Sequence, residues 1–186
     1  MAVDPKAVAA RLEAAGSRRV FRGLMADRIF DRQGEFAGRD EVVRLRTFRA
    51  DEGSPARTII GWKGPVTVEK GAKVRAEIEI EAAGEAEALL RALGFDSVRA
   101  IDRYVEVFEC RAATVRLEWY PRMDVLVEVE GPEVAIAAAI EVTGIDRQAF
   151  TAESLTAFVA RYAARGHPPA VALAELGSAR PSWDHR

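Results

Sequence analysis

The stretch KVRAEIEIE, residues 73–81, alternates strictly between two kinds of side chain. Arg75, Glu77, Glu79 and Glu81 share one parity, and Val74, Ala76, Ile78 and Ile80 share the other. Successive side chains of a β-strand point to opposite faces, so this stretch is predicted to form a strand with one charged and one apolar face. Taken alone, the pattern is typical of an antiparallel sheet whose charges lie in water.

Three further stretches repeat this alternation, and their charges are again grouped by parity. The charged faces carry Arg44 and Arg46 (VRLR, 43–46), Arg116 with Glu118 (VRLE, 115–118), and Glu128 and Glu130 (VEVE, 127–130). Four strands with arginines and paired carboxylates on one face favour the lining of a polar cavity over an outer surface. The apolar faces then need a cover of helices on the outside.

The order of the expected elements indicates an α+β fold. Helices are expected over residues 4–15, 85–93, 133–142 and 152–164, and strands over residues 20–31, 41–49, 57–63, 73–81, 98–110, 114–120 and 125–130. Antiparallel strands of this kind can close into a barrel, which removes exposed edges. We therefore expect a closed or nearly closed antiparallel β-barrel with a polar interior and helices packed outside.

Composition limits the class of protein. A chain of 186 residues, 49% of them hydrophobic, can bury one good core, and a single domain is expected over residues 1–165. Residues 166–186 are expected to form a loosely ordered C-terminal extension. The 29 acidic residues balance 27 basic ones, so no basic field indicates a nucleic-acid partner.

The cysteine content and the length of the apolar segments indicate the cellular compartment. The single cysteine, Cys110, excludes an intramolecular disulfide and fits a reducing compartment. Neither His167 nor His185 is near it in sequence, which makes it a poor candidate nucleophile. No stretch has the length of a membrane span, and the N-terminus lacks the pattern of a signal peptide. We expect a cytoplasmic protein with no membrane partner.

The predicted cavity has a definite chemistry. Charges in a confined space are costly unless something compensates them. Arginine forks bind phosphate oxygens in a bidentate manner. Mg²⁺ prefers oxygen ligands and commonly links carboxylates to substrate phosphates. A cavity with bases on one wall and carboxylates on the other therefore suggests a polyphosphate with a divalent cation.

Short motifs in a fixed order identify a resemblance. They are DRIFD (27–31), RLR (44–46), IGWKGP (60–65), RAEIE (75–79), LE (117–118) and LVEVEG (126–131). Each is weak alone, but in this order and spacing the chain resembles the CYTH superfamily of triphosphate tunnel metalloenzymes, which includes class IV adenylate cyclase and thiamine triphosphatase. The correspondence runs from residue 4 to about residue 164, which is most of the chain.

The resemblance implies a closed tunnel of eight antiparallel strands that binds a triphosphate with Mg²⁺ or Mn²⁺. By position, the phosphate-binding residues are Arg44, Arg46, Lys63, Arg75 and Arg103, of which Lys63 and Arg103 are also implied as catalytic. The implied ligands of the metal or its waters are Glu77, Glu79, Glu118, Glu128 and Glu130. The substrate is then a small triphosphate such as ATP, thiamine triphosphate or inorganic polyphosphate.

The expected function is metal-dependent hydrolysis or cyclisation of that triphosphate, as a triphosphatase or an adenylate cyclase. A degenerate, non-catalytic module that binds polyphosphate or nucleotide is the alternative. A third reading is a barrel without a ligand. A second copy of the chain is a further expected partner, since an unfilled strand edge in the barrel can pair with another chain.

The sequence departs from the family pattern in three places. The family has a strand E-x-E-x-K before its first helix, whereas this sequence begins MAVDPKAV at that helix. Its K-x-R strand corresponds to Arg103-x-Val105, which lacks the second base, and Asp124 stands where the family has a glycine. Two interpretations follow: the first strand lies before Met1, or the chain has lost the ability to bind the metal.

Overall fold

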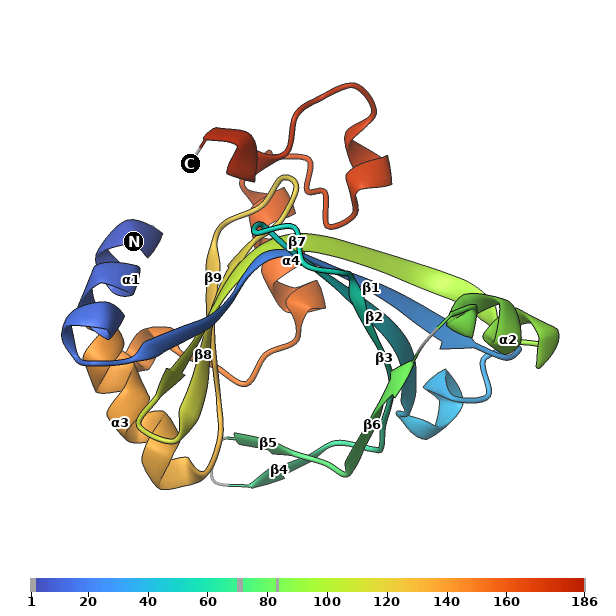
Figure 1. The fold of residues 1–186 in the computed structure, drawn as a ribbon, viewed down its shortest axis with the longest axis horizontal. Coiled ribbons are helices and arrows are strands. Elements are labelled where there is room, and N and C mark those ends of the chain that lie inside the picture. Colours follow the sequence, from blue (N-terminus) through green and yellow to red (C-terminus); the bar gives the residue numbers. More distant parts are fainter. Residues whose placement is uncertain (1–2, 70–71, 83, 186) are drawn as a thin grey trace. The chain divides into compact units, whose positions relative to one another are not determined.

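A computed structural model describes residues 3–69, 72–82 and 84–185 of the chain (Figure 1). The chain forms two compact units, of which unit 1 comprises Met1–Gly23 and Arg103–Arg186, and unit 2 comprises Leu24–Asp102. The division falls within two long strands, β1 (Arg18–Asp31) and β7 (Asp96–Cys110), so each of them contributes one part to either unit.

Seven antiparallel strands form the main sheet, in the order β6-β3-β2-β1-β7-β8-β9. Besides β1 and β7, its members are β2 (Val42–Ala50), β3 (Arg57–Lys63), β6 (Glu77–Ala82), β8 (Ala113–Trp119) and β9 (Leu126–Glu130). The α+β class is confirmed. The eight-stranded closed tunnel implied by the resemblance is not reproduced in the described residues, because β6 and β9 end the strand order of a seven-stranded sheet.

In the described residues, four α-helices accompany the sheet, at or near the positions that the sequence predicts. They are α1 (Pro5–Ala14), α2 (Ala86–Ala92), α3 (Glu133–Thr143) and α4 (Leu155–Ala164). Asp4 caps α1 as expected, because its carboxylate accepts hydrogen bonds from the backbone N–H groups of Lys6 and Ala7 at 3.0 and 3.3 Å. Among the described helices, none combines the length and apolar character needed to cross a membrane.

Unit 2 separates its two faces as the alternation predicts. Val43 and Leu45 of β2 pack with Phe30 of β1 and with Ala86 and Leu90 of α2. Figure 1 shows α2 beside the strands that it covers. The residues of opposite parity on β2, β3 and β6 bear the charges. The apolar face is buried on β2, whereas Ile78 and Ile80 on the apolar face of β6 are 60% and 58% exposed.

The stretch 73–81 is not one strand, which corrects the sequence prediction. Its first part belongs to β5 (Ala72–Val74), which pairs with β4 (Thr67–Glu69) in a separate two-stranded sheet. Its second part is β6, whose pairing with β3 ends at Lys63 and Glu77. Beyond this point one backbone hydrogen bond remains, from the Gly64 N–H to the Ala76 carbonyl at 2.9 Å, and the next residue, Pro65, has no N–H to donate.

Unit 1 has its own core beneath α1 and α3. Val8 and Leu12 of α1 are buried, as are Ala139 and Ile140 of α3. Helix α3 contacts α1, β8 and β9 (Figure 1). On β8 the buried apolar residues Val115 and Leu117 alternate with Arg116 and Glu118, so this strand also separates an apolar face from a charged one.

The C-terminal segment, which the sequence analysis expects to be loosely ordered, makes specific contacts within unit 1. Arg122 and Ala170 form an isolated antiparallel bridge with backbone hydrogen bonds of 3.0 and 2.9 Å. The Ser182 hydroxyl donates to the Tyr120 carbonyl at 2.7 Å. Leu176 and Trp183 are 8% and 7% exposed, so apolar burial accompanies these hydrogen bonds.

Candidate functional site

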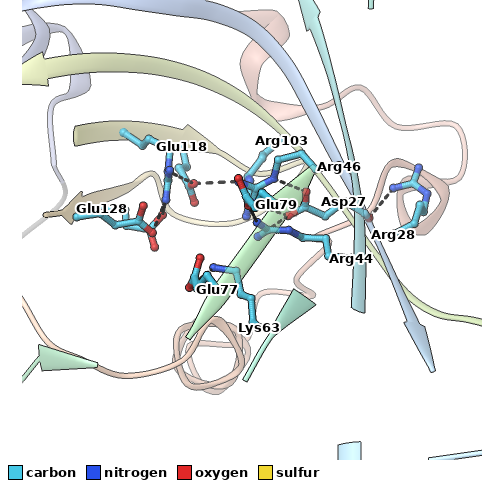
Figure 2. A network of polar contacts seen from close by, with 12 residues as sticks. Asp27, Arg28, Arg44, Arg46, Lys63, Glu77, Glu79, Arg103, Glu118 and Glu128 are labelled. Carbon is cyan, nitrogen blue, oxygen red and sulfur yellow. Dashed lines mark hydrogen bonds and ion pairs between the residues drawn. The ribbon is translucent and has the colours of Figure 1, made fainter. Parts of the chain in front are cut away.

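The predicted site residues divide between the two units. Unit 2 contains Arg44, Arg46, Lys63, Arg75, Glu77 and Glu79, and unit 1 contains Arg103, Glu118, Glu128 and Glu130. Within each unit the structure brings these residues into ion pairs, which Figure 2 shows in part. We call the unit 2 group, together with Asp27, the basic cluster. The three predicted metal ligands of unit 1, Glu118, Glu128 and Glu130, are called the carboxylate trio.

Strand register explains why Arg44 reaches Glu79. Arg44 of β2 lies opposite Gly61 of β3, and Gly61 lies opposite Glu79 of β6, so the three form one row on one face. The arginine extends across β3 over Gly61, and its Nη2 lies 2.8 Å from Glu79 Oε1. A Cβ atom on Gly61 would make an ordinary contact of 3.6 Å with Oε1 of Glu79.

Arg46 is held by a residue to which the sequence assigned no role. Asp27 of β1 accepts hydrogen bonds from Nε and Nη2 of Arg46, at 2.6 and 2.8 Å (Figure 2). Arg44 also lies near this carboxylate, with 3.8 Å between its Nη1 and Oδ2 of Asp27. The side chain of Asp27 is 3% exposed and that of Arg46 is 10% exposed, so this is a buried ion pair in bidentate geometry.

Lys63 forms a pair with the residue directly opposite it. It lies opposite Glu77 in the β3–β6 register, and its Nζ is 2.7 Å from Glu77 Oε1. Arg75 Nε approaches the same oxygen to 3.3 Å. Burial lowers the pKa of Lys63, although the hydrogen bond to Glu77 opposes this effect. Partial burial raises the pKa of Glu77, but Lys63 and Arg75 outweigh it and lower that pKa below its ordinary value.

In unit 1, the carboxylate trio surrounds Arg116. Glu128 lies opposite Arg116 in the β8–β9 register and accepts hydrogen bonds from its Nη2 and Nε at 2.7 and 3.0 Å. Glu130 Oε1 is 2.6 Å from the same Nη2, and Glu118 Oε1 is 3.6 Å from Nε. Burial lowers the pKa of Arg116, but the three carboxylates raise it by more, so the pKa lies above its ordinary value.

Glu118 is the most deeply buried carboxylate of the trio. Its side chain is 4% exposed, and its Oε2 accepts a hydrogen bond from the Tyr120 hydroxyl at 2.6 Å. Its Oε1 is buried without a hydrogen bond, 3.6 Å from Nε of Arg103. Val105 stands opposite Glu118 in the β7–β8 register, at the position where the resemblance implies a second base. Burial raises the pKa of Glu118, more than the nearby arginines lower it.

The residues present do not fit a resident divalent cation. Each of the five glutamates predicted as metal ligands lies within 4.0 Å of a lysine or arginine nitrogen. In the described part of the chain, no three His, Cys, Asp or Glu side chains gather so as to hold a metal ion. The predicted ligands therefore form ion pairs with basic side chains.

Sequence reasoning missed three residues of these clusters: Asp27, Arg116 and Tyr120. Asp27 belongs to the DRIFD motif, and Arg116 to the alternating VRLE stretch, so both positions carried a signal. These patterns did not reveal the ion-pair partner of either residue, because Asp27–Arg46 and Arg116–Glu128 join different strands. Tyr120 follows β8 and carried no distinguishing pattern.

Comparison with known proteins gives a fold but no sequence relative. No protein-family model matches the chain, and no curated protein matches it in sequence. A structure from Pyrococcus horikoshii OT3 has 18% identity and a TM-score of 0.64, over 86% of this chain and 95% of that chain.

Two further solved structures have descriptions that name an activity. A candidate adenylate cyclase from Vibrio parahaemolyticus is 14% identical, with a TM-score of 0.66 over 84% of this chain and 92% of that chain. A candidate adenylyl cyclase from Hippeastrum, described as having a dominant triphosphatase activity, is 13% identical, with a TM-score of 0.58 over 86% and 91%. At these identities the likeness concerns the fold alone, and the CYTH-like fold that the sequence implies is confirmed.

Proposed function

We propose that this chain binds a triphosphate compound through the basic cluster of unit 2. The observation that carries the proposal is the gathering of four basic side chains: Arg44, Arg46 and Lys63 on one face of β2 and β3, and Arg75 in the segment just before β6. Three carboxylates lie among them, those of Asp27, Glu77 and Glu79, so the cluster keeps one positive charge in excess. Guanidinium forks and a lysine ammonium are the groups that proteins use to bind phosphate oxygens.

The seven charges of the cluster have different roles in this proposal. Asp27 and Arg46 are buried and joined by two hydrogen bonds, so they hold the cluster in shape. The side chains of Glu77 and Glu79 are 41% and 42% exposed, and they form ion pairs with Lys63 and Arg44, respectively. An incoming phosphate replaces these two carboxylates, and its oxygens then accept the hydrogen bonds that Glu77 and Glu79 accept in the free protein.

A bound triphosphate suggests a reaction as a second step. The activities named for the Vibrio and Hippeastrum proteins make hydrolysis or cyclisation the reactions to test. Arg44 and Lys63 would stabilise the charge that develops on the phosphoryl oxygens, which is the main protein contribution to phosphoryl transfer. Binding without turnover is the alternative, and the pairing of all five implied metal ligands with basic residues favours it.

Calorimetric titration of tripolyphosphate tests the binding. The protein is titrated in buffer with Mg²⁺ and again with EDTA, alongside the double variant Arg44→Ala with Lys63→Ala. A matched double variant, Arg91→Ala with Arg99→Ala, removes two basic residues that lie outside the basic cluster. We expect binding in both buffers, a loss of at least about tenfold in the cluster variant, and little change in the matched one.

Two results would reject the proposal: the absence of binding in both buffers, or equal binding by the cluster variant and the wild type. Turnover is then measured as phosphate or pyrophosphate released from ATP, thiamine triphosphate and tripolyphosphate. Release that depends on Arg44 and Lys63 makes the protein an enzyme. Tight binding without release makes it a receptor for polyphosphate.

A further inference from the structure

We infer that the guanidinium of Arg116 takes the place of a divalent cation within the carboxylate trio, and that replacing Arg116 by a neutral residue opens a site for Mg²⁺ or Mn²⁺. This inference concerns unit 1 alone. It does not depend on whether the basic cluster of unit 2 binds a phosphate.

The first support is geometric. One nitrogen of Arg116, Nη2, lies 2.7 Å from a carboxylate oxygen of Glu128 and 2.6 Å from one of Glu130. Nε lies 3.0 Å from Glu128 Oε2. Carboxylate oxygens of Glu128 and Glu130, which lie two positions apart on β9 and so share one face, thus converge on one guanidinium group. A hard cation needs the same convergence of carboxylate oxygens, at shorter distances and in larger number.

The second support is the buried oxygen of Glu118. Its Oε1 is buried, has no hydrogen bond, and lies 3.6 Å from Nε of Arg116. A buried carboxylate oxygen without a hydrogen-bond donor is costly, because it has lost water and gained only the charges of Arg103 and Arg116, each 3.6 Å away. A divalent cation at the position of the guanidinium would give this oxygen a direct partner.

The third support is charge. When all three glutamates are ionised, the trio carries three negative charges, and Arg103 contributes one positive charge beside Glu118. With Arg116 present the group has a net charge of minus one, which a divalent cation would overcompensate while lying against a guanidinium. With Arg116 made neutral, the net charge is minus two and matches the charge of one divalent cation. Arginine keeps its proton at all ordinary pH values, so the wild-type site excludes the metal permanently.

The test is a titration with Mn²⁺, followed by the loss of the electron paramagnetic resonance signal of the free ion. Arg116→Ala removes the whole side chain, and Arg116→Gln keeps much of its length and can still donate hydrogen bonds. Both variants should bind Mn²⁺ at least about tenfold more tightly than the wild type. Saturating Mn²⁺ should also raise their unfolding temperature and leave that of the wild type unchanged.

Three controls show whether the ion occupies this site. Arg116→Lys keeps the positive charge and should gain no Mn²⁺ affinity. Arg161→Ala removes an arginine that pairs with a single carboxylate, Glu153, at 2.6 Å, and should also gain none. Adding Glu118→Gln to Arg116→Gln should abolish the gained affinity, since it removes one of the three carboxylates.

Two outcomes would overturn the inference. The first is tight Mn²⁺ binding by the wild-type protein that is lost on Glu128→Gln, because the metal would then coexist with Arg116. The second is a folded Arg116→Gln variant with no greater Mn²⁺ affinity than the wild type. The first outcome is tested with the wild type and Glu128→Gln alone, and the side chain of Glu128 is about half exposed. This test therefore remains possible even if substitutions at Arg116 impair folding.

Discussion

Arg44 and Glu79 form an ion pair of 2.8 Å although a whole strand, β3, lies between the strands that bear them. Neighbouring strands are about 4.8 Å apart, so the two backbones are separated by about twice that distance. The strand register places Arg44, Gly61 and Glu79 in one row, so the long arginine side chain passes over the glycine of β3 to reach Glu79. The charged face of unit 2 is therefore organised by strand register.

The first prediction concerns Glu79 as a competitor for phosphate. Glu79→Gln removes the charge that occupies Arg44 Nη2, so tripolyphosphate should bind several-fold more tightly than to the wild type, on the order of 1 kcal/mol. The control is Glu81→Gln, which removes the same charge from the same side of the same strand, opposite Ile59 instead of Gly61. Calorimetry should show a much smaller gain for Glu81→Gln, and equal gains would contradict displacement of Glu79.

The second prediction concerns the buried pair Asp27–Arg46. Asp27→Asn should lower the free energy of unfolding by about 3 kcal/mol, because it leaves the buried Arg46 without a compensating charge. Urea unfolding measures the change. Glu87→Gln breaks a pair with Arg91 in which both side chains are about half exposed, and should cost less than about 1 kcal/mol. Similar losses in the two variants would show that Asp27 does not stabilise unit 2 in this way.

How far the sequence predicts this fold is visible in β2. The alternation of Val43 and Leu45 with Arg44 and Arg46 predicts two faces, and the structure confirms both. Parity is a local property of a strand, so the sequence contains it. The pattern does not reveal which carboxylate each arginine meets. Asp27 lies 19 residues before Arg46 in the chain, and only the pairing of strands brings the two together.

The sequence predicted one continuous strand over residues 73–81, and this prediction was wrong. The alternation of side chains is a local property, whereas the ends of a strand depend on the neighbouring strand with which it pairs. The alternation of residues 73–81 is continuous, but Lys63 is the last residue of β3 available to pair, so the strand divides before Glu77. The Gly64-Pro65 signal marked the end of β3 correctly. It also determined where β6 begins, and this consequence can be seen only once the β3–β6 register is known.

The third prediction concerns the C-terminal segment. Leu173 and Leu176 belong to the same short helix, η3 (Leu173–Leu176), but Leu176 is 8% exposed and Leu173 is 41% exposed. Leu176→Ala should lower the free energy of unfolding by about 2 kcal/mol or more through the cavity that it leaves. Leu173→Ala should cost clearly less, because less of its surface leaves water on folding. Equal and small losses in urea unfolding would support the loosely ordered extension that the sequence predicts.

The fourth prediction is a pH dependence set by Glu118. Burial raises the pKa of Glu118 above 4.5, and the unfolded chain titrates near that ordinary value. Between the two pKa values the native protein holds a proton that the unfolded protein has lost. The contribution of Glu118 to the free energy of unfolding is therefore largest below the unfolded pKa and falls as the pH rises through the native one. Tyr120, whose own pKa burial raises well above 10.0, remains a hydrogen-bond donor throughout.

Glu118→Gln removes this titration while keeping the shape of the side chain. The free energy of unfolding of the variant relative to the wild type should therefore increase with pH above about 4.5 and level off beyond the native pKa of Glu118. Urea unfolding at a series of pH values measures the difference, and Glu109→Gln, at a 57% exposed position on β7, is the control. A difference that decreases with pH would mean that the native pKa of Glu118 is lowered, because Arg103 and Arg116 would then outweigh its burial.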